Sequence, residues 1–119
     1  MYYQDAVMEE LNSIKTIPSS FLETGGLKIY TNLDMNAQKA LEDSANKNIT
    51  NPDIQMAGVV MDPQNGKVLA LSGGRDYNKS QYNRATMAKR QVGSTIKPFL
   101  YYSALENGFT PSTTFTSEK

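Results

Sequence analysis

Two β-rich runs joined by an Asn-Gly turn constrain the fold of this chain more than any other feature. Residues 54–62 and 67–72 flank the connection Pro63-Gln64-Asn65-Gly66. Asn-Gly in this position favours an antiparallel hairpin, because both residues tolerate a positive φ. Residues 57–61 are almost continuously apolar, so we expect their strand to be covered on both faces. The sequence therefore predicts a hairpin that lies inside a mixed α and β domain.

Hydrophobic periodicity predicts further elements before the hairpin. Residues 2–14 have the pattern of an amphipathic helix, and residues 16–24 that of a loop or linker that ends at two glycines. Residues 26–33 alternate between apolar and polar side chains, as in a half-buried strand. Asp34 is positioned to cap a helix that extends to about Asn48. The sequence thus predicts three strands in all.

A last helix is expected over residues 94–107, with Gly108 as its C-cap. Its side chains are apolar almost all round, which predicts a central, buried helix. Both ends of the chain have the character of cuts, since it starts inside an apparent helix and stops after a loop at 110–116. We therefore expect a piece of a longer protein.

Composition excludes several classes of function. The 119 residues hold 12 basic and 12 acidic side chains, so the net charge of zero does not indicate a nucleic-acid partner. Cysteine and histidine are both absent, which excludes disulfides, Ser-His-Asp catalysis and ordinary zinc sites within this chain. No cofactor is indicated, and no stretch approaches the roughly 20 apolar residues of a transmembrane helix.

Residues 90–98 carry the strongest chemical signal, because they set Ser94 three positions before Lys97 where a helix begins. Positions i and i+3 of a helix share a face, so the hydroxyl and the amine can approach hydrogen-bonding distance. A serine becomes a good nucleophile when a neighbouring base takes its proton, and a partly desolvated lysine can be that base. The same spacing recurs at Ser44 and Lys47, which we interpret as a solvated helix face.

The chain resembles the N-terminal part of the transpeptidase domain of class A (bifunctional) penicillin-binding proteins, for which Ser-x-x-Lys is a signature. The matching blocks, in the family's order, are residues 26–34, 57–74, 73–77, 82–85, 90–98 and 105–111. The resemblance implies two parts: residues 1–24 form the linker helix and loop after a glycosyltransferase domain, and residues 25–119 belong to an incomplete transpeptidase domain. The implied fold is α/β (α+β), β-lactamase-like, with an antiparallel sheet and a buried nucleophile helix.

The resemblance also implies a reaction, the cross-linking of peptidoglycan on the extracytoplasmic face of the bacterial cell membrane, to which the parent protein is anchored. Ser94 would attack the D-Ala-D-Ala carbonyl of a stem peptide, with Lys97 as general base and the Ser94 N–H as an oxyanion donor. β-Lactams would acylate the same serine. Asn83 is a candidate for substrate binding, with loop anchoring as the alternative, and Arg75-Asp76 is interpreted as a local turn or ion pair.

The chain departs from the family pattern after Ser94, where it lacks both Ser-x-Asn and Lys-[Ser/Thr]-Gly. We therefore expect this piece to be inactive alone, to need the remainder of the domain as partner, and to self-associate through exposed Phe99, Leu100 and Leu105. Two alternatives stay open, a β-lactam-reactive hydrolase or sensor of the same fold and a non-catalytic module.

Overall fold

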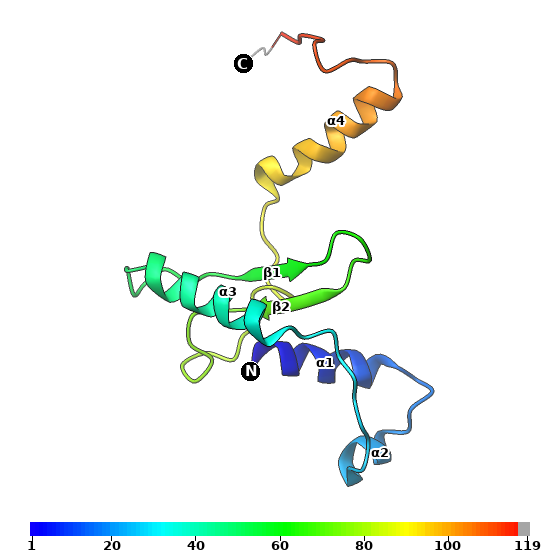
Figure 1. The fold of residues 1–119 in the computed structure, drawn as a ribbon, viewed down its shortest axis with the longest axis vertical. Helices are drawn as coiled ribbons and strands as arrows, with labels where there is room; N and C mark the ends of the chain where they lie inside the picture. The colour runs from blue at the N-terminus through cyan, green and yellow to red at the C-terminus, as the bar shows by residue number, and fades with distance from the viewer. Residues whose placement is uncertain (117–119) are drawn as a thin grey trace. The chain divides into compact units, whose positions relative to one another are not determined.

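The computed structural model describes residues 1–116, shown in Figure 1. The elements in chain order are α1 (Tyr2–Ser13), α2 (Ser19–Thr24), α3 (Met35–Asn48), β1 (Gly58–Met61), β2 (Val68–Ser72), the 3₁₀ helix η1 (Gly93–Ile96) and α4 (Lys97–Glu106). They fall into two compact units, one made of residues 1–88 and one that begins at Lys89. This mixture of helices with a two-stranded antiparallel sheet confirms the predicted α/β (α+β) class.

The hairpin forms where the Asn-Gly turn predicts it. Strands β1 and β2 pair antiparallel, with Gly58 opposite Ser72 and an irregularity between Val60 and Met61. In the turn, the Asp62 N–H donates to the Lys67 carbonyl at 2.9 Å and the Gly66 N–H donates to the Asp62 carbonyl at 2.8 Å. Only the glycine of the pair has a positive φ, +72°, so the turn uses the freedom of Gly66 and not that of Asn65.

Helix α3 covers the hairpin from one side, as the element contacts and Figure 1 both show. Its predicted N-cap is confirmed, since Asp34 Oδ1 accepts hydrogen bonds from the N–H groups of Asn36 and Ala37 at 2.9 and 3.1 Å. At Gly58, an added Cβ would lie 3.0 Å from Leu41 Cδ1. The helix therefore packs closely against β1 and starts where its cap requires.

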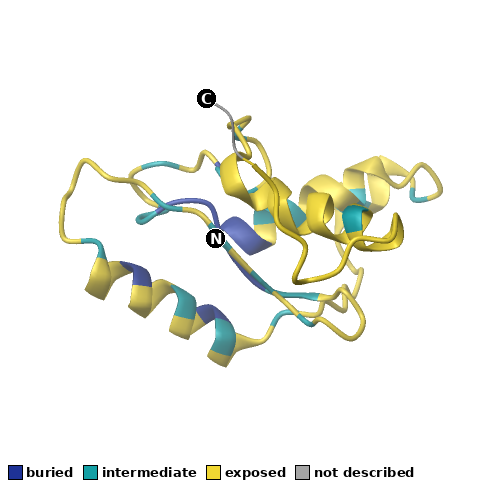
Figure 2. Cartoon of the chain, turned by 90° about the horizontal axis from the view of Figure 1, so that it is seen from above, coloured by how far each residue is buried: buried dark blue, intermediate teal, exposed yellow. Residues whose placement is uncertain are grey.

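Helix α1 contributes to the core of the same unit. Tyr2 and Tyr3 are buried together with Leu71 of β2. The Tyr3 hydroxyl donates to the Val68 carbonyl at 2.8 Å, and the Tyr2 ring packs edge-on against the Tyr77 ring with centroids 5.0 Å apart. Figure 2 shows buried residues in β2 and at the start of α1. The predicted helix at 2–14 is thus confirmed and packs on the hairpin.

The predicted third strand is wrong. Residues 26–33 do not pair with another strand, and only at their end does the Asp34 N–H donate to the Leu69 carbonyl, at 2.8 Å. The reason lies at the outer edge of β2, where the side chain of Gln38 bonds to both main-chain groups of Leu71. An additional strand would need those same groups.

Three further expectations differ from the structure. Strand β1 is not covered on both faces, because Val59 is 47% exposed and alternates with half-buried neighbours. The predicted loop at 16–24 contains the short helix α2. Helix α4 has no buried side chain, and Phe99 is 72% exposed. A helix is buried only when another element packs on it. Among the described residues of the unit that begins at Lys89, no helix or strand covers α4.

Candidate active site

Ser94 and Lys97 are joined by one 3₁₀ turn near the start of the second unit. Ser94 belongs to η1, and Lys97 is the first residue of α4. The Lys97 N–H donates to the Ser94 carbonyl, which is the i+3 to i bond of a 3₁₀ turn. Because side chains at i and i+3 eclipse each other in a 3₁₀ helix, this geometry sets the serine and the lysine on one side of the backbone. The backbone thus has the i, i+3 relationship that the sequence predicts for the pair, and the catalytic roles of the two residues stay a prediction.

The local sequence explains why the helix begins in this way. Gly93 has a φ of +54°, which turns the chain into η1, and the Thr95 hydroxyl donates to the Val92 carbonyl at 2.5 Å. Pro98 lies in the first turn of α4, where its missing N–H leaves no bond unmade. The first N–H groups of a helix have no partner inside it, and that of Ser94 is one of these.

Both side chains of the pair are exposed to solvent. Among the hydrogen bonds of residues 1–116, none joins Ser94 Oγ to Lys97 Nζ. The arrangement supports general-base chemistry only when Lys97 loses part of its water and stays beside Ser94.

Asn83 lies in the first unit and is 4% exposed. Its Oδ1 accepts from the Ala85 N–H at 3.2 Å, and its Nδ2 donates to the Tyr2 carbonyl at 3.5 Å. Its backbone lies so close to Gly73 that a Cβ there would be 2.6 Å from Asn83 Cα. These contacts make Asn83 the anchor of the loop after β2, which is the alternative role that the sequence analysis considered. A role of Asn83 in substrate binding stays a prediction.

Arg75 has a structural role that the sequence analysis missed. Its guanidinium donates to the carbonyls of Ile49 and Asn51, both at 2.7 Å, just beyond the end of α3. Among residues 1–116 it makes no ion pair with Asp76. Long-range bonds from one arginine to several carbonyls leave no signal in a single sequence, so the turn or ion-pair interpretation did not identify this clamp.

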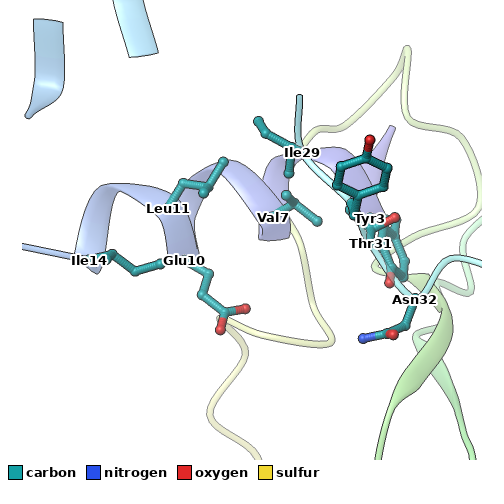
Figure 3. Close-up of a pocket in the computed structure, with 9 residues that line it drawn as sticks. Tyr3, Val7, Glu10, Leu11, Ile14, Ile29, Thr31 and Asn32 are labelled. Atoms are coloured by element: carbon teal, nitrogen blue, oxygen red, sulfur yellow. The ribbon is translucent and has the colours of Figure 1, made fainter. Parts of the chain in front are cut away.

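A groove of about 280 Å³ lies between α1 and residues 29–32 (Figure 3). Val7 and Leu11 of α1 and the following Ile14 line one side of it, and Ile29 and Thr31 line the other side. Within residues 1–116, no group of acidic side chains has the arrangement of a metal site. In the same range, no helix has the length and apolar character needed to cross a membrane.

Comparison with known proteins shows which family and which relatives this chain is similar to. The family model described as the penicillin binding protein transpeptidase domain matches residues 56–119, a range that contains the hairpin, Ser94 and Lys97. Penicillin-binding protein 2D of Bacillus subtilis (strain 168) is 44% identical over 119 residues, which are 99% of this chain and 17% of that protein. No solved structure matches the chain.

Two further relatives show the same pattern. Penicillin-binding protein 1A of Escherichia coli (strain K12) is 58% identical over 59 residues, which are 50% of this chain and 7% of that protein. Penicillin-binding protein 4 of Bacillus subtilis (strain 168) is 39% identical over 102 residues, 84% of this chain and 16% of that protein. The chain therefore spans less than a fifth of the length of each. Since the family model covers more than half of the chain and includes its Ser-x-x-Lys turn, the chain belongs to the penicillin-binding protein transpeptidase domain family.

Proposed function

We propose that this chain is the N-terminal part of the transpeptidase domain of a serine-type D-Ala-D-Ala transpeptidase that cross-links peptidoglycan. Residues 1–24 are the linker helix and loop from a preceding glycosyltransferase domain, and residues 25–119 belong to the transpeptidase domain. The observation that carries the proposal is the 3₁₀ turn that sets Ser94 and Lys97 on one side of the backbone inside the family match. Within residues 1–24, Tyr2 and Tyr3 of α1 pack against Leu71 of β2, which supports a linker that contacts the domain that follows.

The reaction proceeds through an acyl-enzyme. Ser94 Oγ attacks the carbonyl of the penultimate D-Ala while Lys97 Nζ accepts the hydroxyl proton. The carbon–nitrogen bond to the terminal D-Ala then breaks, and that D-Ala leaves as an amine with a proton returned from Lys97. An acceptor amine then attacks the carbonyl of the Ser94 ester and gives up a proton to Lys97 Nζ. The bond between the acyl carbon and Ser94 Oγ breaks, Oγ takes the proton back from Lys97, and the new amide leaves with the serine restored. The free N–H of Ser94 stabilises the oxyanion of each tetrahedral intermediate.

β-Lactams react with the same serine. Attack of Ser94 Oγ on the strained lactam carbonyl opens the ring and leaves a covalent ester on the protein. The ring nitrogen stays attached to the acyl group, so no leaving group departs to make room for an acceptor amine. Stem peptides and β-lactams are thus the two classes of ligand that we assign to Ser94.

The chain alone lacks groups that this reaction needs. After Ser94 the sequence contains neither Ser-x-Asn nor Lys-[Ser/Thr]-Gly, and Lys97 is exposed. Misplacing catalytic groups by about 1 Å can cost about 100-fold in rate, and here whole groups are absent. We infer that the remainder of the domain is an obligatory partner, because it excludes water from the side chains of Ser94 and Lys97. We also infer that this chain alone is inactive.

The proposed setting is the extracytoplasmic face of the bacterial cell membrane, with the anchor in another part of the parent protein. Helix α4 presents a set of apolar side chains to solvent, of which Phe99 and Leu100 are 72% and 62% exposed. In the absence of the rest of the domain, such a surface favours self-association of this chain. Neutral net charge gives no support to nucleic acid as a partner.

Two other functions are compatible with the same turn, a β-lactam-reactive hydrolase or sensor and a non-catalytic module. The family match favours the transpeptidase over both. The test is to treat the longer parent protein with a penicillin, digest it and locate the covalent adduct by mass spectrometry. We expect the adduct on Ser94, its loss in Ser94→Ala and its persistence in Ser44→Ala, the matched control at the second Ser-x-x-Lys. A folded parent without an adduct would favour the non-catalytic module.

A further inference from the structure

The turn of the hairpin contains an asparagine followed by a glycine, a pair with a chemistry of its own. Asn65 and Gly66 lie in the loop that joins β1 to β2 in Figure 1, and both are exposed to solvent. In such a pair the main-chain nitrogen of the glycine can attack the side-chain carbonyl of the asparagine, because no Cβ on the glycine obstructs the approach. The turn is thus a place where the chain can modify itself.

This reaction uses three groups of the turn, and a hydrogen bond holds each of them. The attacking nitrogen belongs to Gly66, whose N–H donates to the Asp62 carbonyl at 2.8 Å. The leaving nitrogen, Asn65 Nδ2, donates to Asp62 Oδ2 at 3.0 Å. The oxygen of the same amide, Asn65 Oδ1, accepts from the Lys67 N–H at 2.9 Å. Attack requires the Gly66 N–H to lose its proton and the side-chain amide to turn toward it, so the closed turn is unreactive.

Asp62 is the residue on which the closed turn depends. Its carbonyl holds the Gly66 N–H, and its carboxylate holds the Asn65 amide. The same carboxylate accepts from the Gln64 N–H at 2.9 Å, and Asp62 is half-buried whereas residues 63–67 are exposed. Hydrogen bonds to an ionised carboxylate are stronger than those between neutral groups. The Asp62 side chain therefore controls how often the turn opens.

We propose that Asn65 is a site of spontaneous deamidation and that Asp62 sets its rate by keeping the turn closed. When the turn opens, the Gly66 nitrogen gives its proton to water and bonds to Asn65 Cγ. The bond from Cγ to Nδ2 then breaks, and Nδ2 takes up a proton and leaves as ammonia. The result is a cyclic imide between Asn65 and Gly66.

Water opens this imide at either of its two carbonyl carbons. Breaking the new bond, from Cγ to the Gly66 nitrogen, leaves aspartate at position 65. Breaking the original main-chain bond leaves isoaspartate, in which the chain continues through the side-chain carbonyl. In both products a carboxylate, ionised near neutral pH, replaces the amide that donated to Asp62. Two like charges then face each other, so the modification weakens the turn that limited it.

Ageing of the full-length parent in mildly alkaline buffer tests the proposal. Mass spectrometry of digested samples measures conversion of Asn65, because replacing NH₂ by OH raises the mass of its peptide. We expect conversion about 10-fold slower in the parent than in a free peptide of residues 60–69, since bonds of the turn must first break. Asp62→Ala should bring the rate close to that of the peptide. Asp62→Asn, which keeps an acceptor without the charge, should give an intermediate rate.

Two controls separate Asp62 from other effects. Gln64→Ala changes an exposed side chain of the same turn that makes no hydrogen bond within residues 1–116, so it should leave the rate unchanged. The second Asn-Gly pair, at Asn107, is an internal control. Its Nδ2 donates to the Ser103 carbonyl, not to a carboxylate, so changes at Asp62 should leave its conversion unchanged.

Three outcomes would overturn the inference. Conversion of Asn65 in the natural parent at the rate of the free peptide would show that the turn gives no protection. The natural rate in both Asp62 variants would show that Asp62 does not control the reaction, and Asp62→Asn alone decides this point if Asp62→Ala does not fold. Equal acceleration by Gln64→Ala and Asp62→Ala would show that any change in the turn opens it.

Discussion

The side chain of Gln38 in α3 bonds both main-chain groups of Leu71 in β2, with Nε2 donating to the carbonyl at 3.0 Å and Oε1 accepting from the N–H at 2.9 Å. Gln38 is 3% exposed and Leu71 is 7% exposed. An amide side chain thus takes the place of a neighbouring strand at this point of the edge. The bond pair both ties α3 to the hairpin and closes the edge of β2 at Leu71 to residues 26–33.

Gln38→Leu should therefore destabilise the first unit strongly. The substitution keeps the approximate size of the side chain but leaves the buried N–H and C=O of Leu71 without partners. Each such group costs about 1–3 kcal/mol, so for the two groups we expect a loss of about 2–6 kcal/mol in the free energy of unfolding. Urea unfolding followed by circular dichroism measures it. The neighbouring Lys39→Ala, which removes an exposed i,i+4 ion pair with Asp43, should leave stability almost unchanged.

The Tyr77–Asp5 contact should make stability fall at high pH. The Tyr77 hydroxyl donates to Asp5 Oδ2 at 2.6 Å, and this hydrogen bond to a carboxylate, with some desolvation, raises the pKa of Tyr77 above 10.0. A raised folded-state pKa stabilises the fold fully below the unfolded value, and the contribution is lost as the pH rises through the folded value. Stability should therefore decline above about pH 10.

Tyr77→Phe should flatten this decline and lower stability at pH 8, where the hydrogen bond is intact in the natural chain. Burial also raises the pKa of Tyr2, so part of the decline should remain in the variant. Chemical unfolding at several values between pH 8 and pH 11 gives the comparison. Tyr30→Phe is the control, because Tyr30 is 91% exposed and should leave the profile unchanged. A Tyr77→Phe profile identical to that of the natural chain would contradict the assignment.

Gly73→Ala should be more harmful than Gly58→Ala. A Cβ at Gly73 would lie 2.6 Å from Asn83 Cα, and backbone cannot move aside without displacing the loop anchored by Asn83. We expect a cost of about 3 kcal/mol or more. At Gly58 the nearest atom is Leu41 Cδ1 at 3.0 Å, the end of a flexible side chain, so about 1 kcal/mol is expected. Equal costs in thermal or urea unfolding would refute the close backbone approach.

Lys97→Gln in the full-length parent should slow acylation of Ser94 by penicillin. A positioned general base contributes about 10²- to 10⁴-fold to a proton-transfer step, and glutamine cannot accept the proton. Labelling with a fluorescent penicillin, quenched at a series of times, gives the rate constant of acylation. Lys47→Gln, which makes the same change at the second Ser-x-x-Lys, should have no effect. Acylation at the natural rate in Lys97→Gln would remove Lys97 from the proposed mechanism.

The elements with local causes were predictable from the sequence. The Asn-Gly turn, the Asp34 cap and the 3.6-residue periodicity of α1 and α3 act over a few residues, and the hairpin and these helices form where predicted. The Ser94–Lys97 spacing belongs to the same class. The 3₁₀ turn sets the i+3 relationship of their backbones without help from distant parts of the chain.

Tertiary structure decided the features that depend on a distant partner. Residues 26–33 have the alternation of a strand, but pairing requires a free edge, and Gln38 from the next helix occupies that of β2 at Leu71. Asn83 and Arg75 acquire their roles only through carbonyl groups of Tyr2, Ile49 and Asn51. The apolar pattern of α4 predicted a buried helix, and the structure leaves α4 exposed, because burial is a property of two surfaces. Sequence periodicity describes only one of them.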